Sequence, residues 1–206
     1  FCVFSDHGFE SWRTGFNVNT WLRELGYLAV KTPELAKEGF LTGIDWAKTR
    51  AYSVGLSSLY LNLQGRETQG TVERARADGL VAELREKLLG VKDPFTGHKA
   101  FSNVYTRNDY SGEAMDEAPD IVLGYDRYFQ SSKDCAKGAV AQRLFEPNED
   151  KWSGEHAASD AAWIPGMLLT NRLIEKDDPD IRDLGITALK FLGKDIPSDF
   201  EGTSLM

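Results

Sequence analysis

The chain has 206 residues, a net charge of −8 and a pI near 5.0, with 41% apolar and 27% charged residues. This length can bury a sizeable core, and the composition is typical of a globular domain. The negative charge argues against a partner that is a nucleic-acid polymer. It leaves a small phosphate substrate open, because a bound metal ion reverses the local field. No apolar run approaches the roughly 20 residues of a membrane span.

The first element expected is a buried strand over residues 1–5, which ends abruptly at Ser5-Asp6-His7-Gly8. Ligands in open α/β sheets sit at the carboxyl ends of strands. A carboxylate beside an imidazole suits a divalent metal such as zinc, and Gly8 lets the backbone turn sharply next to the ion. Because a core strand begins at residue 1 without a preceding Met, the chain is expected to be part of a longer protein.

The middle of the chain alternates predicted helices and strands. Periodic apolar residues predict helices over 19–27 and 72–89, the second ending at Gly90. A turn is expected at Asp93-Pro94-Phe95-Thr96-Gly97. Strands are expected over 51–54, 59–63, 101–106 and 121–125.

The last third of the sequence begins with a polar segment in which no helix or strand is predicted. Residues 130–155 are polar and are predicted to form a long surface loop, a feature that is often functional. A turn and strand follow over 164–171, and a helix over 183–192. Strands and helices therefore mix throughout, which predicts the α/β class.

Two cysteines cannot make a disulfide framework. Cys2 lies in an apolar run and is predicted to be buried, whereas Cys135 lies in a polar stretch and is predicted to be exposed. Such sparing use of cysteine favours the cytoplasm only slightly, so the compartment stays open.

The chain has three histidines. His98 sits in a turn and is expected to be solvated. His7 is equally well explained as a metal ligand or as a loop histidine bonded to a carbonyl. His156 follows the long polar segment and would be a surface histidine by default. Asp6, His7 and His156 are nevertheless three ligands of the types that a catalytic zinc uses.

Other polar residues have plainer interpretations. Ser5 is expected to cap the turn through its hydroxyl, and Asp120 to be structural. Arg50 and Arg66 suit phosphate geometry, but a surface ion pair is the favoured interpretation of each one alone.

Several segments together resemble the type I phosphodiesterase/nucleotide pyrophosphatase branch of the alkaline phosphatase superfamily. The resemblance covers nearly the whole chain and rests on segments that occur in the family's order. They are Ser5-Asp6-His7-Gly8-Phe9, Asn19-Thr20-Trp21-Leu22 with Gly26-Tyr27-Leu28, Trp46-Ala47-Lys48-Thr49-Arg50-Ala51-Tyr52, Tyr60-Leu61-Asn62-Leu63-Gln64-Gly65-Arg66-Glu67, Ala118-Pro119-Asp120, Trp152-Ser153-Gly154-Glu155-His156, Pro165-Gly166, residues 181–193 and residues 196–205.

The resemblance implies a hydrolase with two divalent metal ions, zinc or alternatively manganese, acting on a small phosphoester or nucleotide. Asp6 and His7 match ligands of one metal, and His156 matches a ligand of the other. The nucleophile lies upstream in the family. Residues 1–206 are thus expected to be the C-terminal part of an alkaline phosphatase-like α/β domain with a mixed or parallel sheet, carrying an inserted subdomain at roughly 30–125. The chain alone is expected to be inactive.

Three alternatives remain open. The chain resembles, less closely, the phosphoglycerate mutase-like and sulfatase-like members of the same superfamily. A non-catalytic binding or assembly domain that keeps the fold is the third. If part of the sheet lies outside the chain, the exposed strand edge favours self-association.

Overall fold

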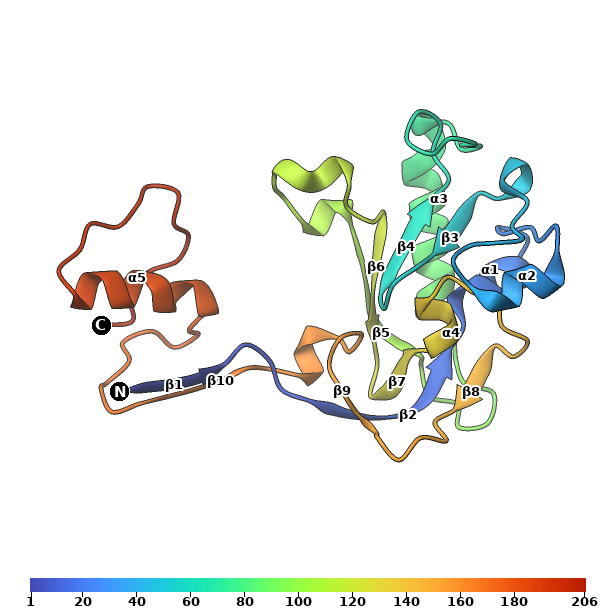
Figure 1. The fold of residues 1–206 in the computed structure, drawn as a ribbon. Coiled ribbons are helices and arrows are strands. Elements are labelled where there is room, and N and C mark those ends of the chain that lie inside the picture. The colour runs from blue at the N-terminus through green and yellow to red at the C-terminus, as the bar shows by residue number, and fades with distance from the viewer. The chain divides into compact units, whose positions relative to one another are not determined.

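The computed structural model describes residues 1–206 and divides them into two compact units (Figure 1). The larger unit is Phe9–Ile164, and the smaller is built from both ends of the chain, Phe1–Gly8 and Pro165–Met206. Both units combine helices with strands, so the predicted α/β class is confirmed. The subdomain predicted at 30–125 falls within the larger unit and stays a prediction. None of the helices is long and apolar enough to cross a membrane.

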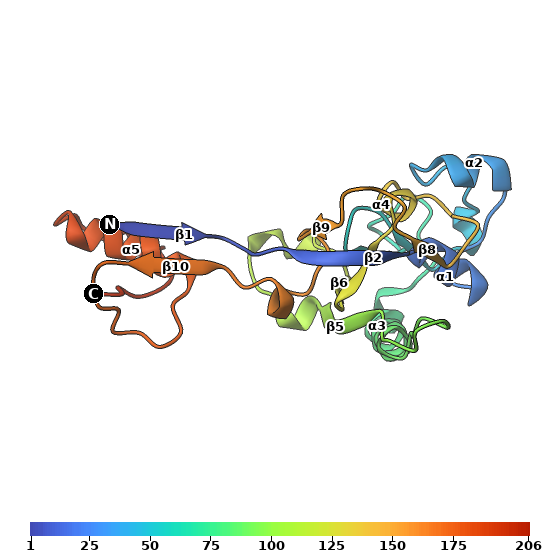
Figure 2. The same cartoon turned by 90° about the horizontal axis from the view of Figure 1, so that it is seen from below.

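The smaller unit is a two-stranded antiparallel sheet with one helix. Strand β1 (Cys2–Ser5) pairs with β10 (Met167–Thr170), so that Cys2 lies opposite Thr170 and Ser5 opposite Met167 (Figure 2). The strand predicted at the N-terminus is confirmed, but its predicted burial is wrong. Phe1 is 79% exposed and Val3 is 50% exposed. Cys2 is exposed too, because β1 has only one neighbouring strand to cover it.

Helix α5 (Ile181–Phe191) begins at a capping box formed by Asp180 and Asp183. The Asp183 carboxylate is buried and gathers three segments of the smaller unit. It accepts hydrogen bonds from Lys176 Nζ at 2.7 Å, Asp180 N at 2.8 Å and Thr203 N at 2.7 Å. These donors, led by Lys176, hold the pKa of Asp183 well below its ordinary value.

This carboxylate makes the smaller unit sensitive to acid. Because the folded-state pKa of Asp183 is lowered, its contribution to stability is present above the ordinary pKa of 3.8 and is lost as pH falls below it. We expect Asp183→Asn to lower the melting temperature at pH 7 and to leave a smaller difference from wild type near pH 3. Circular dichroism melts across this range test the expectation, and a pH-independent difference would contradict it.

In the larger unit, strand β2 (Glu10–Phe16) is the centre of a mixed sheet. It pairs in parallel with β7 (Tyr128–Ser131) on one side and antiparallel with β8 (Phe145–Pro147) on the other. The short β9 (Gly154–Glu155) pairs with the start of β2, placing Glu155 opposite Glu10.

The second sheet of this unit has the order β3 (Ala51–Ser53), β4 (Ser58–Leu61), β6 (Ile121–Tyr125) and β5 (Phe101–Thr106), antiparallel throughout. Helix α3 (Arg74–Leu89) packs on it and contacts β5 most. Strands β5 and β6 have the predicted bounds. Helix α3 also confirms its prediction, with Leu80, Leu84 and Leu88 buried and Gly90 at the C-cap.

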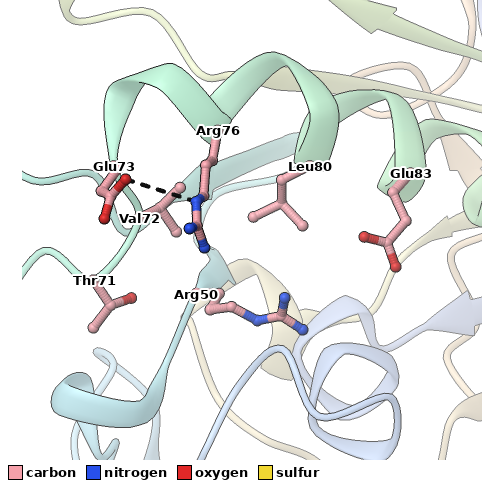
Figure 3. A pocket seen from close by; sticks show the side chains of 7 residues that line it. All are labelled: Arg50, Thr71, Val72, Glu73, Arg76, Leu80 and Glu83. Atoms are coloured by element: carbon pink, nitrogen blue, oxygen red, sulfur yellow. Dashed lines mark ion pairs between the residues drawn. The ribbon is translucent and has the colours of Figure 1, made fainter.

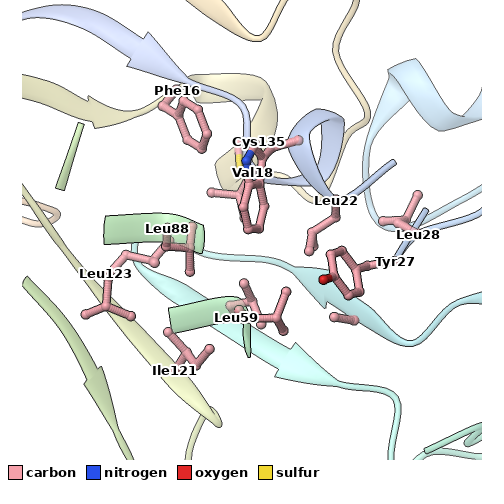
Figure 4. Packing of buried hydrophobic residues seen from close by; sticks show 14 of the residues in the cluster. Phe16, Val18, Leu22, Tyr27, Leu28, Leu59, Leu88, Ile121, Leu123 and Cys135 are labelled. Carbon is pink, nitrogen blue, oxygen red and sulfur yellow. The ribbon is translucent and has the colours of Figure 1, made fainter. Parts of the chain in front are cut away.

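The core lies between these sheets and the helices (Figure 4). Alternate residues of β4 and β6 turn inward, so Leu59, Leu61, Ile121 and Leu123 are buried together. Helix α1 (Val18–Glu24) closes the other side with Val18 and Leu22. It confirms the helix predicted at 19–27 but ends three residues earlier, and Leu25 of the predicted apolar stripe is exposed. The remaining helices, α2 (Pro33–Glu38) and α4 (Lys133–Ala136), are short.

Residues 130–155 are not the surface loop that the sequence predicts. They contain the end of β7, helix α4, β8 and β9. Ser132 is buried and caps α4, accepting a hydrogen bond from Cys135 N at 3.0 Å, and its hydroxyl also bonds Asn17. Cys135 is fully buried, contrary to its predicted exposure. Internal hydrogen bonds of this kind let a polar stretch enter a core.

Candidate functional site

Asp6 and His7 follow β1 directly, at the tip where the sequence places them. Asp6 Oδ1 accepts a hydrogen bond from His7 N at 3.1 Å, and His7 Nδ1 lies 2.9 Å from the Gly8 carbonyl oxygen. Because a carbonyl oxygen only accepts, Nδ1 carries the proton, and the lone pair of the neutral ring is on Nε2. That nitrogen lies 3.7 Å from Asp6 Oδ1.

This geometry fits two neighbouring ligands of one divalent ion. Two tetrahedral zinc ligands, each about 2.0–2.2 Å from the ion, stand about 3.4 Å apart. The 3.7 Å between Nε2 and Oδ1 is close to that separation. Metal-bound histidines also commonly donate their other nitrogen to a carbonyl or carboxylate, as His7 does toward Gly8. The donor types and their spacing therefore suit a metal.

Gly166 and Met167 hold the backbone of this tip. A Cβ atom at Gly166 would lie 2.5 Å from the Ser5 carbonyl oxygen and 3.2 Å from that of Asp6, so only glycine fits. Met167 N donates to Ser5 Oγ at 3.0 Å, so the Ser5 hydroxyl is structural, but it bonds the neighbouring strand and not its own turn as expected. In the sequence, Pro165-Gly166 is only one of the segments that resemble the family, and no local pattern predicts its close approach to Asp6.

An open hollow of about 540 Å³ lies beside the tip, within the smaller unit. Asp6 lines it together with Phe4, Gly166, Asp178 and Ile181. Asp6 is thus accessible, with 71% of its side chain exposed, whereas the His7 ring is 30% exposed.

His156 belongs to the larger unit and follows β9. Its backbone N donates to Glu155 Oε1 at 2.9 Å, its Nδ1 lies 3.6 Å from the same oxygen, and its ring meets Phe9 edge-on at 5.1 Å. No group of three or more His, Cys, Asp or Glu residues is arranged to hold a metal ion. Since His156 and the Asp6–His7 pair lie in different units, their joint participation in a metal centre stays a prediction.

The remaining polar candidates divide into residues with structural contacts and residues that face a hollow or solvent. Asp120 is structural, as expected: its carboxylate accepts from Leu61 N at 2.7 Å and from both terminal nitrogens of Arg66, at 2.7 and 3.2 Å. Arg66 is fully engaged there and with Glu67, so it is not available for a phosphate. Arg50 instead faces a small hollow, and His98 is exposed in its turn.

Comparison with known proteins decides the family. The family model described as Type I phosphodiesterase / nucleotide pyrophosphatase matches residues 1–156, about three quarters of the chain. The chain belongs to this family. The match spans the Asp6–His7 tip and ends at His156, and it assigns the protein to phosphoester hydrolases of the phosphodiesterase and pyrophosphatase type. No curated protein and no solved structure matches the chain.

Proposed function

We propose that this chain contributes metal ligands to a phosphodiesterase-type hydrolase that cleaves a small phosphoester or nucleotide. Asp6 and His7 would hold one divalent ion and His156 would belong to the site of a second, with zinc the expected metal and manganese the alternative. The observation that carries the proposal is the Asp6–His7 tip, where Nε2 and Oδ1 stand at a ligand–ligand distance. When bound, such ions stabilise the charge that develops on the phosphoryl oxygens.

The chain's own residues prepare the tip for this task. The Gly8 carbonyl fixes the proton on His7 Nδ1, which leaves Nε2 as the donor atom. Gly166 lies close to the backbone carbonyls of Ser5 and Asp6, and the Ser5 hydroxyl is bound to β10. We further propose, on the resemblance to the family, that the nucleophile comes from a part of the protein other than these 206 residues. Ser5, the hydroxyl nearest in sequence to Asp6, accepts a hydrogen bond from Met167 N of β10.

The proposal is tested by titrating the chain with zinc in a calorimeter. The metal content of the protein is then measured after gel filtration. We expect His7→Ala and Asp6→Asn each to weaken binding at one site by tenfold or more, since removal of a ligand costs at least as much as the 10–100-fold that loss of a supporting contact costs. His156→Ala should weaken zinc binding at the second site and leave binding at the Asp6–His7 tip unchanged. His98→Ala, a histidine in an exposed turn, is the matched control and should bind like wild type.

Two outcomes would contradict the proposal. Equal zinc binding by the His7 and His98 variants would remove the tip from the metal site. Turnover of bis-p-nitrophenyl phosphate by the 206-residue chain, with purity checked by mass spectrometry, would place the nucleophile inside it.

A further inference from the structure

A second cluster of phosphate-compatible residues lies in the larger unit, at the first turns of α3. Figure 3 shows a hollow of about 250 Å³ between this helix and the segment before β3. It is lined by Arg50, Thr71, Val72, Glu73, Arg76, Leu80 and Glu83. Arg76 extends from the helix toward Arg50, so two guanidinium groups enter one concave surface (Figure 3).

Tyr27 holds the Arg50 side chain in place. Its guanidinium carbon lies 4.6 Å from the centre of the Tyr27 ring, a cation–π distance. Its backbone N donates to the Tyr27 carbonyl at 2.7 Å, and the Tyr27 hydroxyl donates to Glu83. Burial, reinforced by Glu83, raises the pKa of Tyr27 to about 12, so the ring stays a neutral donor. The guanidinium edge is thus oriented without using its N–H groups.

The carboxylates of the hollow are already engaged. Glu73 lies 3.6 Å from Arg76 Nε, which leaves the two terminal nitrogens of Arg76 toward the hollow. Glu83 accepts from Tyr27 and lies 3.9 Å from Lys87 Nζ. The N–H groups that remain to bind a ligand in this hollow are those of the Arg50 guanidinium and the two terminal nitrogens of Arg76.

We propose that Arg50 and Arg76 form a phosphate-binding site. Guanidinium groups present paired donors that match the oxygens of a phosphate group, and charge-assisted bonds of this kind are the strong ones. A volume near 250 Å³ is below that of pockets for drug-sized ligands, so the site takes a single phosphate group. The group is either inorganic phosphate or the terminal phosphate of a monoester. The inference does not depend on the metal ligands proposed above.

The test is a titration of the ¹⁵N-labelled chain with inorganic phosphate, followed through the arginine Nε–Hε signals. We expect saturable shifts of the Arg50 and Arg76 signals. Arg50→Ala and Arg76→Ala should each weaken binding about tenfold or more, the loss that one charge-assisted hydrogen bond implies. Arg50→Lys keeps the charge but not the fork, and should weaken binding as well.

Arg13 supplies the matched control. Its guanidinium also lies 4.6 Å from a tyrosine ring, that of Tyr128, but Arg13 does not line this hollow. Arg13→Ala should therefore bind phosphate like wild type, and melting curves of all variants confirm that they fold. Stronger binding of adenosine monophosphate than of inorganic phosphate would identify a monoester as the ligand, and the reverse order would identify the free ion.

Three results would overturn the proposal. They are shifts that do not saturate, equal binding by the Arg50→Ala and Arg13→Ala variants, and acetate binding as strong as phosphate binding.

Discussion

Asp120→Ala is expected to destabilise the larger unit by about 3–5 kcal/mol, the cost of removing one partner from a buried ion pair. The Asp120 side chain is 3% exposed and joins β6 to β4 through Leu61 N and Arg66. Arg107 adds a third contact at 3.6 Å. Without the carboxylate, the Arg66 charge keeps only Glu67 as an ionic partner, and the Leu61 amide loses its bond to the side chain.

Urea denaturation followed by tryptophan fluorescence measures this loss. Asp116→Ala is the control, because Asp116 is an exposed aspartate only four residues earlier, and its removal should change stability by less than about 0.5 kcal/mol. Asp120→Asn keeps the shape but removes the charge and should fall between wild type and Asp120→Ala. Similar midpoints for the Asp120→Ala and Asp116→Ala variants would show that the pair contributes little.

Gly166→Ala is expected to reduce zinc affinity at the Asp6–His7 tip by about 10–100-fold, the range seen when a contact that supports a ligand is lost. The added methyl would lie 2.5 Å from the Ser5 carbonyl oxygen, which is backbone and can move only by displacing Asp6. The substitution therefore alters the position of a proposed ligand without removing it. Calorimetric titration with zinc is the measurement.

Gly185→Ala is the companion variant in the same unit. Gly185 lies inside α5, and its nearest neighbour to an added Cβ is a Phe200 ring carbon at 3.6 Å, an ordinary contact. Alanine should favour the helix and leave zinc binding unchanged. If Gly166→Ala lowered the melting temperature but bound zinc like wild type, Gly166 would be structural only. If wild type bound no zinc at the tip, the proposed function itself would fail.

Elements with strong local patterns could be predicted from the sequence. Strand β6 is a short apolar run that follows Pro119-Asp120, and β5 is rich in aromatic and β-branched residues. Helix α3 has leucines at helical spacing before Gly90. Such signals depend on neighbours along the chain, and packing did not override them.

The errors arise where burial is decided by distant partners. Cys2 lies in an apolar run, yet β1 has one neighbouring strand and stays exposed. Cys135 lies among polar residues, yet its side chain is buried, because Ser132 and Asn17 satisfy each other inside the core. Asn17 and Ser132 are 115 residues apart, so no local sequence pattern predicts their hydrogen bond.

In the candidate site, too, contacts between adjacent residues could be predicted from the sequence, and contacts between distant residues could not. Asp6 and His7 are adjacent, so the sequence itself placed them together at a strand end. The contact of Gly166 with the Ser5–Asp6 backbone spans some 160 residues and needed the structure. Arg50 and Arg66 looked alike in sequence, and only the buried Asp120 distinguishes them, because it engages Arg66 alone.

The pairing of β1 with β10 has a consequence for the order of folding. Cys2 and Thr170 pair although the whole sequence of the larger unit lies between them along the chain, so closing that loop in an unfolded chain carries a large entropic cost. Once β2 and β9 have paired through Glu10 and Glu155, most of that loop is already fixed. The smaller unit is therefore expected to assemble late, after the larger unit has formed, and to be the first to open when the chain is stressed.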